Sequence, residues 1–308
     1  MLGKNSNQYR AWVEHAAELK NMPRDVELVN LGSTAGKFAF DYSLWHIDKD
    51  KGFSLAYQPQ PLYYDFETLK KYRTHIAQGA KILIIIEEFK LILDAYPEKS
   101  SDDKYYLWLD IGQIRTGNKL TGFLVKNIPC LLHPRFILSE MKRFVLGKRD
   151  NSADSQGTQP VTAESDRKYS DMWYRCWKDE FHWDDSNILP NDARKNININ
   201  YKRLLEMIDY CRELGFTPYI IIPPVSPNLT RLLPDAILTD CLFKPLKKAG
   251  REKSVKVMDL YHDERFMDYT IFGNALTLND KGRRVFNSIV ECEIFPDKQI
   301  SIENNIRK

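Results

Sequence analysis

The stretch "VELVNLGSTAGKFAFDYS", residues 26 to 43, decides the fold. A mostly apolar run ends at Gly32, a serine follows at position 33, and a short Thr-Ala-Gly segment comes next. This pattern predicts a strand over 26–31 with Ser33 just beyond its carboxyl end. Ser33 is then either a nucleophile presented by the turn or the residue that caps the next helix.

Apolar runs and helical periodicities alternate along the rest of the chain. Alternation of this kind predicts parallel strands covered by helices on both faces. We therefore predict a three-layer α/β/α fold with a five-stranded parallel sheet of flavodoxin-like order. The expected strands cover 26–31, 52–57, 81–89, 217–226 and 254–261, and the expected helices cover 8–22, 62–78, 195–214, 234–249 and 280–293.

Residues 147–168 interrupt this pattern, because they are rich in Ser, Asp, Gln and Gly and poor in apolar side chains. Such a composition buries too little surface to offset the entropy of ordering. We predict a flexible surface insertion at 147–168 within one domain that spans residues 1–308.

The overall composition excludes several classes of protein. The 308 residues carry a net charge of +3, with basic and acidic residues interspersed, so we expect no nucleic-acid partner. The five cysteines include no CxxC pair, which argues against a disulfide framework or a zinc site, and we expect no metal and no cofactor. Cysteine usage favours a cytoplasmic protein; an anchor preceding the N-terminus would instead make it membrane-associated.

Ligands of parallel α/β sheets bind at the carboxyl ends of the strands. Ser33 follows the first predicted strand, and Glu87 and Glu88 end the third. His262 follows the fifth, with acidic residues beside it. We expect these side chains to border one crevice.

Three blocks of sequence, in order along the chain, resemble the SGNH (GDSL-like) hydrolase superfamily. "NLGSTAGKFAFDYS" resembles its first block, which carries the nucleophile, here Ser33. "KGFSLAYQPQPLYYDFETLKKY" resembles the second, with Gly52 as the expected oxyanion glycine. "DERFMDYTIFGNALTLNDKGRRVF" resembles the last. The stretches "WKDEFHWDD" and "YIIIPPVSPNLTRLLPD" are further similar to the branch that includes the D-alanyl transfer protein of teichoic acid synthesis. This resemblance implies a role in bacterial surface polysaccharides.

The last block departs from the family's Asp-x-x-His. Asn274 and Thr277 occupy the acid and base positions, and neither can take a proton from a serine at neutral pH. A substitute base would be His262 or one of the strand-end carboxyls Glu87 and Glu88. The interpretation that the sequence favours is a surface histidine at 262 and salt-bridged or rim carboxylates at 87 and 88.

Two functions from different classes remain. The first is a carbohydrate O-acyl esterase or acyltransferase through Ser33, with the Ser33 N–H, Gly52 and Gln58 as oxyanion donors. Gln60, Glu87 and Glu88 would contact the ligand, an acylated glycan, and the acyl donor would be a membrane-bound partner. The alternative is a catalytically degenerate relative that binds a glycan or a protein partner in the same crevice.

Aromatic residues are frequent, as in "MWYRCW" at 172–177. Aromatic side chains on the rim of a groove would stack on sugar rings, although most such side chains belong to a core.

Overall fold

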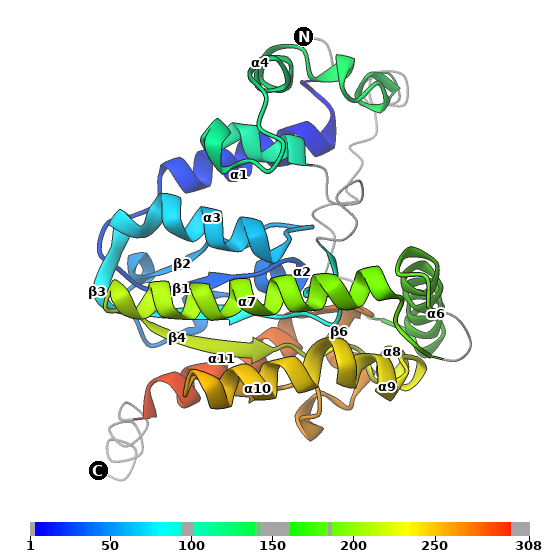
Figure 1. Ribbon diagram of the computed structural model, residues 1–308. Helices are drawn as coiled ribbons and strands as arrows, with labels where there is room; N and C mark the ends of the chain where they lie inside the picture. Colours follow the sequence, from blue (N-terminus) through cyan, green and yellow to red (C-terminus); the bar gives the residue numbers. More distant parts are fainter. Residues whose placement is uncertain (1–3, 94–101, 139–140, 142–160, 184–186, 297–308) are drawn as a thin grey trace.

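Five parallel strands form one sheet in the order β2-β1-β3-β4-β5 (Figure 1). The computed structural model describes residues 4–93, 102–138, 141, 161–183 and 187–296. The strands are β1 (Val26–Leu31), β2 (Gly52–Ser54), β3 (Ile76–Ile85), β4 (Thr217–Ile222) and β5 (Lys256–Asp259), and the hairpin of β6 (Phe272–Asn274) and β7 (Thr277–Leu278) stands apart. This order and direction confirm the predicted flavodoxin-like sheet.

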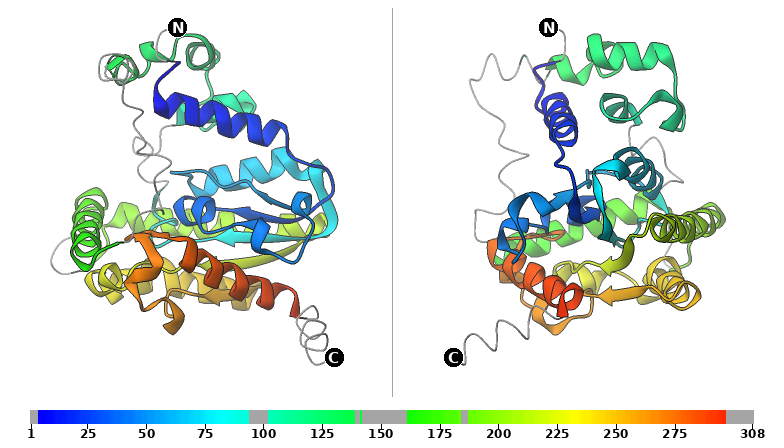
Figure 2. Two further views of the ribbon diagram at one scale, coloured as in Figure 1. Left: turned by 180° about the vertical axis from the view of Figure 1, so that it is seen from behind. Right: turned by 90° about the vertical axis from the view of Figure 1, so that its left-hand side faces the viewer.

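Helices cover both faces of the sheet, because alternate strand residues point to opposite sides. On one face, Ile82 and Ile220 belong to the core that α3, α7 and α10 complete. On the other, Leu83 and Ile221 pack with residues of α2 and α11. The right panel of Figure 2 shows the two helical layers with the sheet between them.

The helices begin and end close to the predicted positions in most of the fold. Their bounds are α1 (Asn7–Lys20), α2 (Thr34–Phe38), α3 (Leu62–Tyr72), α4 (Lys119–Asn127), α6 (Ala163–Glu180), α7 (Asn191–Glu213), α8 (Pro227–Leu232), α9 (Asp235–Leu238), α10 (Lys244–Glu252) and α11 (Asp280–Ile294). The predicted helix 234–249 is divided, because a π-helical turn at Thr239–Phe243 joins α9 to α10. Within the described ranges, none of the helices combines the length and hydropathy needed to cross a bilayer.

The third strand starts five residues earlier than predicted. Ile76 pairs with Val26, and the register then shifts before Lys81 pairs with Leu28. Gly79 lies in this irregular part of the strand and has a φ of 79°, a conformation that favours glycine. The strand ends at Ile85, so Glu87 and Glu88 lie in the loop beyond it.

A separate lobe lies beyond α1, on the side away from the sheet, and contains α4 (Figure 2). Trp12 of α1 is buried and meets the ring of Phe136 edge-on at 5.5 Å. Nε2 of His133 lies 2.8 Å from Oδ2 of Asp103. These contacts attach the lobe to the body of the fold.

Helix α6 occupies part of the segment predicted to be flexible. Residues 147–160 lie outside the described residues, but 163–168 form the first turns of α6, so this end of the predicted insertion is helical instead. Thr162 caps the helix by accepting a hydrogen bond from the N–H of Ser165. Asp166 is fully buried and accepts hydrogen bonds from Ser226 Oγ and Asn228 Nδ2, both at 2.6 Å.

Replacing Asp166 with alanine should destabilise the fold. The substitution leaves the Ser226 hydroxyl and the Asn228 amide without their buried acceptor, which costs about 2–3 kcal/mol. Urea unfolding of Asp166→Ala against the wild-type chain measures the loss. Asp171→Ala, which removes an exposed carboxylate of the same helix, serves as the matched control and should change stability by less than about 0.5 kcal/mol. Equal effects of the two substitutions would contradict this role of Asp166.

Candidate functional site

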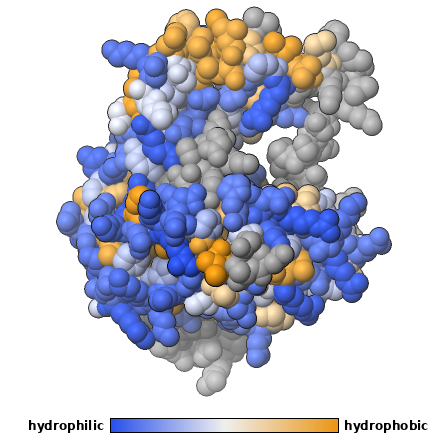
Figure 3. Space-filling model, turned by 45° about the vertical axis from the view of Figure 1, so that its right-hand side comes forward, coloured by the Kyte–Doolittle hydropathy of each residue, from blue (hydrophilic) through white to orange (hydrophobic). Residues whose placement is uncertain are grey.

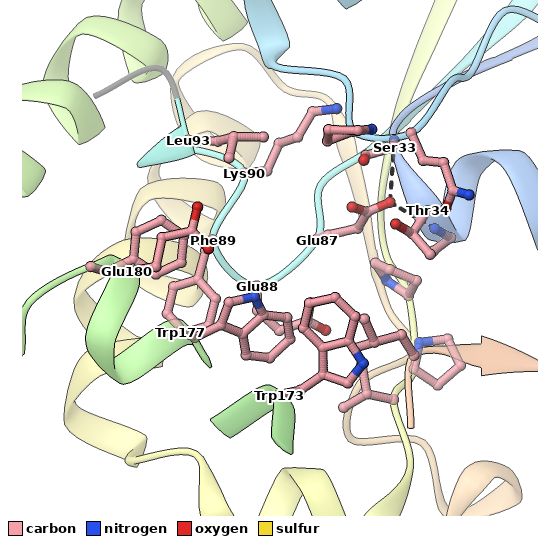
Figure 4. Close-up of a pocket in the computed structure, with 18 residues that line it drawn as sticks. Ser33, Thr34, Glu87, Glu88, Phe89, Lys90, Leu93, Trp173, Trp177 and Glu180 are labelled. Carbon is pink, nitrogen blue, oxygen red and sulfur yellow. Dashed lines mark hydrogen bonds between the residues drawn. The ribbon is translucent and has the colours of Figure 1, made fainter. Parts of the chain in front are cut away.

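A cavity of about 400 Å³ opens at the carboxyl ends of β1, β3 and β4 (Figure 4). Ser33 and Glu87 lie on one side of it, and Trp173 and Trp177 of α6 lie on the other, with Glu88 near the indoles. Its volume falls within the range of roughly 300–1,000 Å³ usual for small-molecule sites. The cavity is therefore the candidate site of this fold.

The backbone around Ser33 has a conformation that only glycine permits. Gly32 has a φ of 143°, and a Cβ there would come within 2.8 Å of the Ile85 side chain. The N–H of Gly32 donates to Asp65 Oδ1 at 3.0 Å. This turn presents Ser33 at the start of α2, as the sequence predicts.

The start of α2 is already occupied by an acidic side chain. Oε1 of Glu87 accepts hydrogen bonds from the backbone N–H groups of Ser33 (3.2 Å), Ala35 (2.8 Å) and Gly36 (3.5 Å). These N–H groups are the donors that an oxyanion at Ser33 would use. Burial raises the pKa of Glu87, while Lys90 and the Ala35 N–H act in the opposite direction. Ionised or neutral, this oxygen fills the place where a substrate oxyanion would bind.

Among the described residues, the Ser33 hydroxyl forms no hydrogen bond with a side chain that could take its proton. The residue is only 4% exposed, and within the described part of the chain its Oγ makes one hydrogen bond, accepted from the N–H of Gln60 at 3.2 Å. An uncharged serine is a poor nucleophile at neutral pH unless a neighbouring group removes its proton. The geometry around Ser33 therefore suits a structural hydroxyl better than a reacting one.

Two buried lysines hold the loop at 59–60 against the Ser33 turn. Lys90 forms an ion pair with the fully buried Asp65 (2.7 Å) and donates to the carbonyl of Gln60. Lys104 donates to the carbonyl of Pro59, and burial lowers its pKa to about 7. The sequence does not distinguish these two lysines from surface lysines, because only the fold reveals that they are buried.

Gln60 supports the loop and does not reach the cavity. Its side chain is fully buried, and Nε2 donates to the carbonyl of Leu55 (3.2 Å) and to Asp65 Oδ1 (2.7 Å). It was predicted to contact the ligand. Gln58, predicted as an oxyanion donor, does line the cavity.

Gly52 lies too far along the sheet to serve Ser33. It opens β2 and pairs with Leu28, whereas Ser33 lies beyond the carboxyl end of β1. A Cβ on Gly52 would come within 2.5 Å of the Tyr42 ring, so the close packing of this ring accounts for the glycine. The predicted oxyanion role does not fit this position.

His262 belongs to another part of the molecule. Its side chain is 58% exposed, Nδ1 lies 2.8 Å from Asp259 Oδ2, and it lines a separate cavity that shares no residue with the one at Ser33. It follows the edge strand β5, whereas Ser33 follows β1. The structure therefore does not bring His262 to the Ser33 cavity, where the base predicted from the sequence would have to lie.

The last block approaches the cavity without supplying a titratable group. Leu276 lines it, whereas Thr277 is buried and faces a small neighbouring cavity beside Ala35. Oδ1 of Asn274 accepts from the N–H groups of Leu276 (2.9 Å) and Thr277 (3.1 Å), which fixes the turn between β6 and β7. Asn274 and Thr277, predicted to occupy the acid and base positions of SGNH hydrolases, thus shape a hairpin.

Two indoles form the apolar wall of the cavity. Trp173 and Trp177 are four residues apart on α6, which places them on one helical face, and their ring centroids lie 5.6 Å apart. Phe89 packs against Trp177 at 4.9 Å. The motif "MWYRCW" contains this signal, but the sequence alone does not show that the helix carrying it faces the carboxyl ends of the strands.

The carboxyl group of Glu88 is buried beside these aromatic rings, with few hydrogen bonds to offset its loss of hydration. It is 4% exposed, its Oε1 has no hydrogen-bond partner among the described residues, and burial raises its pKa to about 8. Among the described residues, His, Cys, Asp and Glu side chains form no group of three or more that could hold a metal ion.

No protein-family model matches this sequence, and a comparison with characterised proteins gave no significant match. The resemblance to SGNH hydrolases therefore remains a prediction carried by the short blocks of sequence.

The raised pKa of Glu88 predicts a pH-dependent stability. Between its ordinary value of 4.5 and about 8, the folded protein holds the Glu88 proton more tightly than the unfolded chain does. This contribution is present below pH 4.5 and is lost as the pH rises towards 8. The wild-type chain should therefore lose on the order of 3–5 kcal/mol over this window relative to Glu88→Gln.

Urea unfolding at several pH values measures this difference. Glu206→Gln, which alters an exposed carboxyl of α7, is the control and should track the wild-type curve. Parallel curves for the wild-type chain and Glu88→Gln would show that Glu88 is not a buried carboxyl.

Proposed function

We propose that this chain is a catalytically degenerate SGNH-like protein that binds carbohydrate in the cavity between Ser33 and the Trp173–Trp177 wall. The observation that carries the proposal is the hydrogen bonding of Glu87 to the N–H groups of Ser33 and Ala35. A hydrolase needs these donors free for the oxyanion of its transition state. A binding protein has no such need, and the carboxyl simply stabilises the start of α2.

The aromatic wall supports a sugar as the ligand. The C–H groups on one face of a pyranose ring carry partial positive charge and pack on the negative face of an indole. Thr34, Gln58, Glu87 and Glu88 also line the cavity and can exchange hydrogen bonds with sugar hydroxyls. The SGNH-like blocks suggest that the glycan belongs to a bacterial surface polysaccharide.

One observation favours a second candidate, an O-acyl esterase or acyltransferase. Ser33 lines the same cavity as Glu88, whose raised pKa of about 8 lies in the range suited to a general base near neutral pH. This candidate requires Glu87 to leave the start of α2 when substrate binds. A membrane-bound partner would then supply the acyl donor of a transferase.

Binding to surface oligosaccharides tests the proposal. A panel of acetylated and unacetylated oligosaccharides identifies a ligand, and calorimetry then measures its affinity. Trp173→Ala and Trp177→Ala should each weaken binding roughly tenfold, about 1–2 kcal/mol, because each removes one stacking surface. Tyr169→Ala, an exposed aromatic of the same helix, is the matched control and should bind as the wild type does.

The reactivity of Ser33 separates the two candidates. A fluorophosphonate probe should leave Ser33 unlabelled in mass spectrometry, and Ser33→Ala should bind sugar as tightly as the wild-type chain. Labelling of Ser33, together with ester hydrolysis that Ser33→Ala abolishes, would contradict the binding proposal and support the esterase.

A further inference from the structure

An exposed apolar surface covers the lobe that contains α4. Figure 3 shows it as the large hydrophobic patch at the top of the molecule. The surface, termed the lobe surface below, comprises six side chains that are 36–66% exposed: Leu120, Phe123, Leu131, Ile137, Leu138 and Met141. A cluster of six exposed apolar side chains indicates a contact surface, whereas single exposed apolar residues are common on any protein.

The fold holds these side chains outward. Gly122 and Val125 form the inner face of α4, and a Cβ on Gly122 would come within 2.8 Å of the Tyr106 ring. Leu120 and Phe123, three residues apart, therefore point away from the body of the lobe. In the following turn, Phe136 is buried against Trp12 while its neighbour Ile137 faces solvent.

The charged residues along the lobe surface are mostly basic. Residues 119–141, which contain all six side chains, include Lys119, Lys126 and Arg135 and a single acidic residue, Glu140. All three cations are exposed. The whole chain mixes both signs and has a net charge of only +3, so this stretch is locally basic within a nearly neutral protein.

We infer that the lobe surface binds the interface of an anionic lipid membrane. Protruding Leu and Phe side chains flanked by Lys and Arg suit the boundary between acyl chains and anionic headgroups. Two copies of the chain related by a twofold axis would bring the same cations against each other, which disfavours a dimer here. A fluid bilayer also accepts protruding side chains without a complementary groove.

Vesicle sedimentation of the full chain tests this inference. The chain should sediment with an equimolar mixture of phosphatidylcholine and phosphatidylglycerol, and much less with phosphatidylcholine alone. Raising the salt concentration should weaken the binding, because it screens the headgroup charge. Lys126→Gln and Arg135→Gln should each lower binding to anionic vesicles about fivefold.

The apolar part of the surface is tested by the double variant Leu120→Glu with Phe123→Glu, which should lose vesicle binding at least about tenfold. Ile199→Glu, at a comparably exposed apolar residue of α7, is the matched control and should bind as the wild type does. Circular dichroism confirms that each variant is folded.

Three results would overturn the inference. They are the absence of sedimentation with anionic vesicles, equal binding by the wild-type chain and the Leu120→Glu/Phe123→Glu variant, and a dimer in solution that this variant abolishes without any vesicle binding. The last result would assign the lobe surface to a second copy of the chain. None of these results depends on whether the cavity binds sugar.

Discussion

The carboxyl group of Glu87 at the start of α2 determines how the site at Ser33 can work. It follows β3, and it reaches across to the N–H groups of Ser33 and Ala35. A parallel sheet brings the carboxyl ends of β1 and β3 together, so this contact is a direct result of the strand order. In a hydrolase, backbone N–H groups at this position would bind the oxyanion of the substrate. Here the Glu87 carboxyl accepts their hydrogen bonds instead.

Buried charges behind the loop at 59–60 make this arrangement rigid. The ion pair of Asp65 with Lys90 is almost entirely excluded from solvent, and it joins Gly32, Gln60 and the turn at Ser33 into one hydrogen-bonded unit. Removing one member of such a pair leaves an uncompensated buried charge, which usually costs about 3–5 kcal/mol. This unit stabilises the geometry of the turn.

The sequence was sufficient to predict the sheet but not the site. Apolar runs such as 81–85 predict buried strands from their own composition, without knowledge of the residues that pack against them. Asp166 was missed because the polar stretch before α6 concealed the helix start at Thr162, and because its buried partners lie about 60 residues further along the chain. Trp173 and Trp177 belong to an aromatic motif that the sequence could not place at the cavity. Gly52 was misplaced because a short motif does not give the level of a residue along its strand, and His262 because a position after a strand does not give the cavity that its side chain lines.

A crystal structure of the protein soaked with acetylated surface oligosaccharides tests the central claim most directly. The account predicts a sugar ring against Trp173 or Trp177, an unmodified Ser33 Oγ, and Glu87 still within hydrogen-bonding distance of the Ser33 and Ala35 N–H groups. An acyl group on Ser33, with Glu87 displaced and an ester oxygen in its place, would contradict it.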